Sequence, residues 1–103
     1  MSALYEAIKQ PNEILPITLD LTDYIPTGET VQGTSSVVIT DSAGQSQTTS
    51  MLQTTTISSP YITAVVKAGT GGSSYTVTFT IKTTNYTLEE EVKLVVKERT
   101  AFT

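Results

Sequence analysis

Acidic side chains are the first candidates for chemistry in this chain, and three of them are consecutive: Glu89, Glu90 and Glu91. A hard cation such as Ca²⁺ prefers several carboxylate ligands, so a run of glutamates could suggest a metal site. Consecutive residues of a strand point to alternate faces, however, and three in a row do not converge. We interpret this run as solvated charge that protects a sheet edge against aggregation.

A second acidic group, Asp20, Asp23 and Glu29, surrounds one expected loop and is a slightly better arrangement for a metal ion. Solvated loop carboxylates remain the favoured interpretation, so we predict no metal site. The glycine-rich stretch 69–72 is not a phosphate-binding loop, because it lacks the lysine and the following helix of that motif. We interpret it as a turn.

Residues needed for several kinds of catalysis are missing. The chain has no Cys and no His, which excludes disulfides, thiolate metal sites and nucleophile–histidine catalysis. Glycoside chemistry would need a carboxyl group held in a dry pocket, and every acid here is expected in a loop or on a polar strand face. We therefore predict no catalytic, cofactor-binding or metal-binding residues, no cofactor and no enzymatic activity.

Charge and hydropathy narrow the possible partners. The formal net charge is −4, the pI is about 4.5, and the six basic residues are scattered. Nucleic-acid binding needs clustered Lys and Arg to neutralise phosphates, so no nucleic-acid partner is predicted. No apolar run approaches the roughly 20 residues that span a bilayer, and the first residues lack the features of a signal peptide. Neither a membrane partner nor secretion is predicted.

The clearest structural signal is a strand with strict alternation after the glycine turn. Tyr75, Val77, Phe79 and Ile81 fall on one face, and three threonines fall on the other. This period of two is typical of a sheet with one buried and one solvated face. Ser and Thr make up about 30% of the chain, and β-branched residues favour pleated sheet over helix. The pattern predicts an all-β fold.

Tyr75 follows a glycine turn at the start of its strand, the position of the tyrosine corner in immunoglobulin-like sandwiches. We predict that its ring is buried and that its hydroxyl group bonds to backbone near the preceding turn. The next alternating strand presents its side chains to the same side of the sheet. The residues expected in the central core are Phe79, Ile81, Leu94 and Val96.

Six or seven short antiparallel strands at roughly ten-residue spacing predict an immunoglobulin-like β-sandwich. Pro16 indicates an edge strand or a bend. Tyr24 and Ile25 are expected to plug one end of the core. Glu90 shares the inward phase of its strand, so we expect it near the hairpin end, where water can reach it. The strands are expected at about 14–21, 31–40, 48–57 (weak and exposed), 61–68, 74–83 and 87–97.

The chain is expected to form one domain, because about 100 residues is the usual size of such a sandwich. Residues 1–12 are interpreted as an N-terminal arm, residues 13–98 as the sandwich and residues 99–103 as a loose C-terminus. The arm is either a frayed end or an extension that docks on a neighbouring subunit, since Leu4, Tyr5 and Ile8 have no obvious place in the sandwich.

Two motifs in the first half and one in the second resemble small virion proteins of tailed bacteriophages. In the first half they are Ile8-Lys9-Gln10-Pro11-Asn12-Glu13 and Asp23-Tyr24-Ile25-Pro26-Thr27-Gly28-Glu29-Thr30-Val31. The second half matches a spaced pattern at Gly69, Gly72, Tyr75, Val77, Ile81 and Thr83, followed by Glu91, Leu94 and Val96. The resemblance covers about residues 8–97. The family often has an aromatic residue where this chain has Val37.

The resemblance implies a non-enzymatic virion structural protein, an immunoglobulin-like assembly or adaptor module of the head, neck or tail. It also implies binding to other virion proteins (head, neck, tail or fibre), homo-oligomers in closed rings, and location in the virion, with the host cytoplasm as the place of assembly. The alternative hypothesis is a bacterial surface adhesin or carbohydrate-binding module. The missing Trp and the missing targeting signal favour the first hypothesis.

Overall fold

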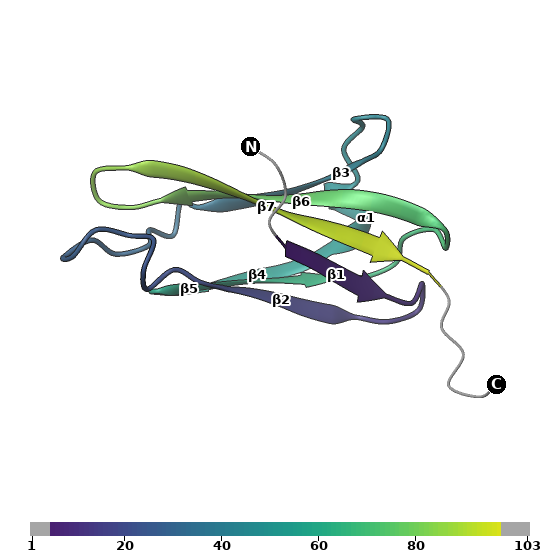
Figure 1. Ribbon diagram of the computed structural model, residues 1–103, viewed down its shortest axis with the longest axis horizontal. Helices are drawn as coiled ribbons and strands as arrows, with labels where there is room; N and C mark the ends of the chain where they lie inside the picture. The colour runs from purple at the N-terminus through teal and green to yellow at the C-terminus, as the bar shows by residue number, and fades with distance from the viewer. Residues whose placement is uncertain (1–4, 98–103) are drawn as a thin grey trace.

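The computed structural model describes residues 5–97, which form two β-sheets packed face to face (Figure 1). One sheet has the strand order β1-β7-β6-β3 and the other β2-β5-β4. The described strands are β1 (Tyr5–Lys9), β2 (Leu15–Asp20), β3 (Ser36–Asp41), β4 (Leu52–Ser58), β5 (Tyr61–Val66), β6 (Ser73–Lys82) and β7 (Thr87–Val96). A short helix α1 (Thr48–Met51) lies between β3 and β4. The prediction of an all-β sandwich is confirmed.

The longest pairing joins β6 and β7 in antiparallel register, from Ser73 opposite Val96 to Lys82 opposite Thr87. Every second residue of both strands faces the other sheet. Phe79, Ile81, Leu94 and Val96 are buried, as predicted. Ile62, Ala64 and Val66 of β5 are fully buried on the facing sheet. The core therefore lies between the two sheets, with polar side chains outside.

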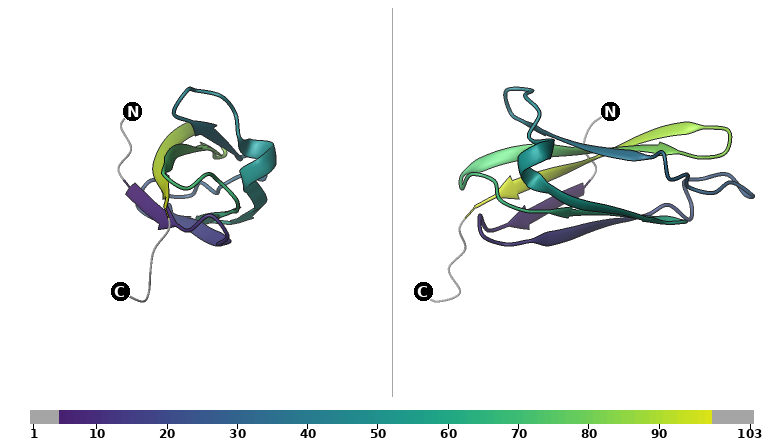
Figure 2. Two further views of the ribbon diagram at one scale, coloured as in Figure 1. Left: turned by 90° about the vertical axis from the view of Figure 1, so that its right-hand side faces the viewer. Right: turned by 180° about the vertical axis from the view of Figure 1, so that it is seen from behind.

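Strand β1 corrects the expectation of a separate N-terminal arm. Tyr5–Lys9 pair with β7, from Tyr5 opposite Val92 to Lys9 opposite Val96, and the two strands run parallel. Strand β1 lies beside β7 at one side of the molecule in both Figure 1 and Figure 2. The sandwich thus begins before residue 13, and its pairing is not purely antiparallel. Leu4 and the expected loose end at residues 99–103 lie outside the described residues.

The segment 48–57 is also more structured than the predicted weak strand. Its first four residues form α1, which lies on the side of the sandwich opposite β1 (Figure 2, left). The Ile39 backbone N–H donates to the Thr48 hydroxyl oxygen (2.9 Å), and the Met51 side chain is buried in the core. This hydrogen bond and the buried methionine favour the helical turn over an extended start of β4.

The structure differs from the expected start of β3 and the expected place of Tyr24, and it agrees with the expected edge position of β2. Strand β3 begins at Ser36, five residues later than predicted, and Val31 is buried in the loop before it. Strand β2 is an edge strand, as Pro16 indicated. Ile25 packs against the core, but the Tyr24 side chain is 47% exposed and does not plug the sandwich.

The predicted burial of Tyr75 and its hydrogen bond to the preceding turn are confirmed. Tyr75 is buried, and its hydroxyl oxygen accepts a hydrogen bond from the Thr70 backbone N–H at 2.9 Å. The turn below it is tight: a Cβ placed on Gly69 would lie 2.9 Å from the Val96 side chain, and Gly69 has a φ of +93°. Glycine is therefore required there both by the backbone angle and by the packing.

We predict that Tyr75→Phe lowers the free energy of unfolding by about 1 kcal/mol, because the Thr70 N–H loses its partner. Tyr61→Phe is the matched control, since Tyr61 is 45% exposed and should change stability by less than about 0.5 kcal/mol. Urea unfolding of both variants measures the difference. Equal stability of Tyr75→Phe and the wild type would show that this hydrogen bond has no role in the turn.

Removal of residues 1–10 is expected to destabilise the fold, because it strips β1 from β7. The loss should be at least about 2 kcal/mol, since several backbone hydrogen bonds at about 0.5–1.5 kcal/mol each disappear. Ile8→Thr is the control, because Ile8 faces outward on β1 and threonine keeps the strand propensity. Unfolding of the truncated chain at the wild-type midpoint would mean that β1 docks without stabilising the sandwich.

Candidate binding surface

The side of the sandwich next to β1 is only half covered. Strand β1 pairs with Val92–Val96, so within residues 5–97 the β7 segment 87–91 has no neighbour on that edge. The other sheet ends on the same side with β2, whose outer edge is also unpaired in the described part of the chain. Two unpaired strand edges therefore flank this opening. Such edges can accept a strand from another chain.

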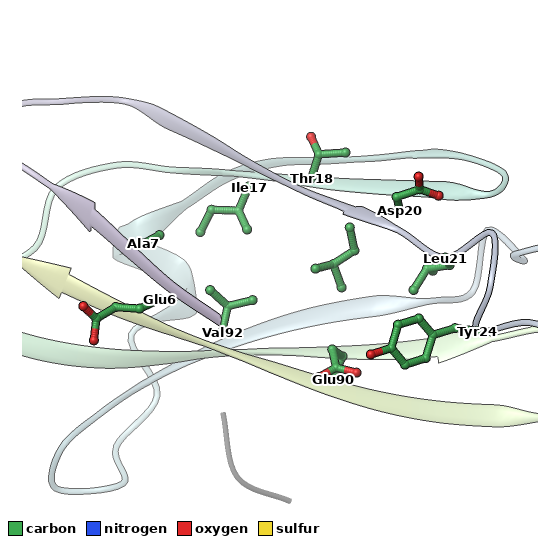
Figure 3. A pocket seen from close by; sticks show the side chains of 10 residues that line it. Glu6, Ala7, Ile17, Thr18, Asp20, Leu21, Tyr24, Glu90 and Val92 are labelled. Carbon is green, nitrogen blue, oxygen red and sulfur yellow. The ribbon is translucent and has the colours of Figure 1, made fainter. Parts of the chain in front are cut away.

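A cavity of about 330 Å³ opens between these edges (Figure 3). It is lined by residues of β1, β2 and β7 together with Leu21 and Tyr24. Ile17, Leu19 and Val92 form apolar walls, and all three belong to the hydrophobic core. We call this space the Glu90 cavity, after the carboxylate that lines it. Its volume is at the lower end of the range for small-molecule pockets in proteins.

Glu90 corrects a prediction made from the sequence. Its inward phase is confirmed, but the side chain is only 5% exposed and is not readily reached by water at a hairpin end. It lies opposite Phe79 in the β6–β7 register, in the body of the sheet. Among the residues that the structure describes, none donates a hydrogen bond to its Oε1 atom. A buried carboxylate oxygen without a partner is unfavourable, because its hydration has been lost without replacement.

Two further carboxylates line the same cavity at its rim. Glu6 of β1 is exposed, and its carboxylate lies 3.9 Å from the Lys93 ammonium group on the outer face, a long and exposed ion pair of the kind that contributes little. Asp20 ends β2, and hydrogen bonds from the Thr22 hydroxyl and backbone N–H hold the pKa of its carboxyl group below the ordinary value. Asp20 is therefore ionised at neutral pH, and the rim is negative.

The inward-facing Lys9 provides a contrast on the same side of the molecule. Its side chain is 0% exposed, and Nζ donates to the carbonyl oxygens of Gln10 (2.6 Å), Pro11 (3.2 Å) and Ala68 (2.5 Å). Burial lowers the pKa of this ammonium group. Lys9 lies opposite Val96, six residues from Glu90 along β7, or about 20 Å at strand spacing. It cannot neutralise Glu90.

The other sequence candidates do not form a site. The Glu29 carboxylate is held at a loop junction by the Asn85 backbone N–H (2.9 Å) and side-chain amide (2.7 Å), and these bonds lower its pKa. Residues 5–97 contain no group of three side chains suited to a metal ion. Glu89 is exposed and Glu91 half-buried, so the three glutamates alternate in direction, as predicted. Stretch 69–72 forms the expected turn.

The outward residues Tyr61 and Val65 lie on the outer face of the β2-β5-β4 sheet. They share this face with a hydrogen-bonded pair of threonines, Thr18 and Thr63, whose hydroxyl oxygens are 2.9 Å apart. No helix in the described range is long and apolar enough to cross a membrane.

Comparison with protein families gives a match that covers nearly the whole chain. Residues 9–97 match the family described as podophage GP4 fiber-tail adaptor protein gp77. The chain belongs to this family. The match confirms the resemblance to tailed-phage virion proteins and supports a structural role in a virion. A search among curated proteins found no match.

The buried carboxylate was indicated by the sequence only in part. Glu90 lies within the residues that match the gp77 family, and the alternation along β7 predicted that its side chain faces inward. Its depth depends on β2 and on Tyr24, which come from a distant part of the chain and line the cavity beside it. Figure 3 shows the Glu90 carboxyl group and the Tyr24 ring at the same end of the cavity.

We predict that Glu90→Met raises the free energy of unfolding by about 1–3 kcal/mol, the usual penalty of an unsatisfied buried polar group. Methionine has a similar length and no polar atom that needs hydration. Glu89→Met is the matched control on the exposed face of the same strand, with an expected change below about 0.5 kcal/mol. Urea unfolding measures both. A less stable Glu90→Met variant would show that the carboxylate is needed by the isolated fold.

Proposed function

We propose that this chain is a non-enzymatic adaptor that joins fibre and tail in a podophage particle, by binding other virion proteins on both sides. The match of residues 9–97 to the gp77 fibre–tail adaptor family carries this proposal. The lack of histidine and cysteine is in keeping with a structural role, because it removes the usual nucleophile–base pairs.

We further propose that the module is immunoglobulin-like. Strands C, F and G form one sheet of such domains, and strands B, E and D belong to the other. The orders β3-β6-β7 and β2-β5-β4 correspond to these two sets. The Tyr75–Thr70 hydrogen bond falls at the E–F corner, where immunoglobulin-like domains place their corner tyrosine. Both observations support the assignment.

The partners are proposed to be proteins and not nucleic acid or membrane. The net charge of −4 opposes binding to phosphates or to anionic lipid. Unpaired edges on both sheets offer sites for strand addition, and we propose that copies of the chain assemble into a homo-oligomer during particle assembly in the host cytoplasm. A symmetric ring would present several equivalent sites to fibres.

The proposal is tested in particles of the phage that encodes the chain. Mass spectrometry of purified particles should detect the protein, and particles made without it should carry tails that lack fibres. Electron microscopy scores the fibres, and expression of the wild-type chain in the same host is the control that restores them. Particles that retain their fibres without this protein would contradict the adaptor role.

A further inference from the structure

The residues that line the Glu90 cavity carry negative charge and no positive charge, which is unfavourable in a closed core. The acidic residues Glu6, Asp20 and Glu90 are among those that line it, Glu6 and Asp20 from its rim with their carboxyl groups directed outward (Figure 3), and no Lys or Arg lines it among the residues described. The fold satisfies its other buried charge fully, since Lys9 donates to three carbonyl oxygens. Among residues 5–97, Oε1 of Glu90 is the one buried side-chain oxygen or nitrogen left without a hydrogen-bond partner, and it lies beside the uncovered part of the β7 edge. A group that donates to this oxygen is thus absent from the described fold.

A metal ion fits this site poorly. Residues 5–97 hold no group of three metal-ligating side chains, and the cavity walls are mainly apolar. A long side chain fits better, because its aliphatic part can contact Ile17, Leu19 and Val92 while its charged end reaches the carboxylate. An arginine can also donate two parallel hydrogen bonds to one carboxylate.

We propose that the Glu90 cavity receives an arginine or lysine side chain from an extended segment of a partner virion protein, and that this segment adds as a strand to the edge of β7 at residues 87–91, which has no neighbour within residues 5–97. The partner class rests on the proposed function. In strand addition, backbone hydrogen bonds supply affinity and pockets for alternate side chains supply specificity. The β7 edge provides the first and the Glu90 cavity the second.

The negative rim adds selectivity. Asp20 and Glu6 attract a basic segment during encounter, and they repel an acidic one. The unsatisfied Oε1 of Glu90 then discriminates between basic and neutral side chains, because only a donor can replace its lost hydration. The site is thus destabilising in the free protein and becomes favourable when the partner is bound.

The test uses the full chain and short capped peptides in which valine and threonine alternate around a central arginine. Peptides with glutamine or glutamate at the centre are the ligand controls. Isothermal titration calorimetry should show the arginine peptide binding tightest. Glu90→Gln should weaken its binding about tenfold or more, the effect of removing one partner of a buried charge pair. Glu89→Gln removes the same charge from the exposed face and should change the affinity less than about twofold.

Particle assembly supplies a second readout. A Glu90→Met chain should still fold, yet it should enter particles without holding its partner. If the wild-type chain is absent from particles, the proposed function fails. If the chain is present, but Glu90→Met particles keep their partner and all three peptides bind equally, the cavity proposal alone is overturned.

Two other occupants are outcomes that contradict the proposal. Self-association in light scattering that disappears in Glu90→Gln would assign the cavity to a second copy of this chain. If removal of residues 1–4 destabilises the wild-type chain but not the Glu90→Met chain, the cavity belongs to the chain's own terminus. Absence of both effects, together with arginine-specific binding, supports a separate basic partner.

Discussion

The antiparallel register of β6 and β7 determines which side chains enter the core and which line the candidate site. Ten consecutive residue pairs join these strands, from Ser73 opposite Val96 to Lys82 opposite Thr87. Since side chains alternate, a shift by one residue would turn the whole apolar set of a strand toward solvent. The register that buries Phe79 and Leu94 also directs Glu90 inward. The Glu90 carboxylate is buried because it lies on the same face of β7 as the apolar side chains of the core.

Strand β1 pairs with only part of the β7 edge, so β7 has a paired half and a half without a neighbour in the described chain. Beside Val92–Val96, strand β1 completes the sheet and brings Lys9 to its carbonyl partners. Beside residues 87–91 the described chain provides no strand, and there Glu90 lies in a cavity without a donor for Oε1. Unsatisfied buried groups and open edges are unfavourable in a free domain. In the assembly that we propose, an added strand and its basic side chain satisfy both.

The sequence predicted those parts of the fold that depend on local periodicity. Strands β5, β6 and β7 alternate cleanly, and their burial follows. Strand β1 was missed because its inward phase holds Lys9, which a polarity pattern assigns to solvent; only the distant Ala68 carbonyl and the adjoining turn make its burial favourable. Helix α1 depends on a hydrogen bond across from β3. The depth of Glu90 likewise depends on β2 and Tyr24, which no single-strand pattern contains.

A reconstruction of the adaptor within the assembled tail shows directly what lies against Glu90 in the particle. We expect an extended segment of another protein paired with β7 along residues 87–91, with an arginine or lysine side chain inside the cavity and a nitrogen within hydrogen-bonding distance of the Glu90 carboxylate. A cavity without a protein side chain, in an adaptor whose fibre and tail contacts lie on other faces, would contradict it.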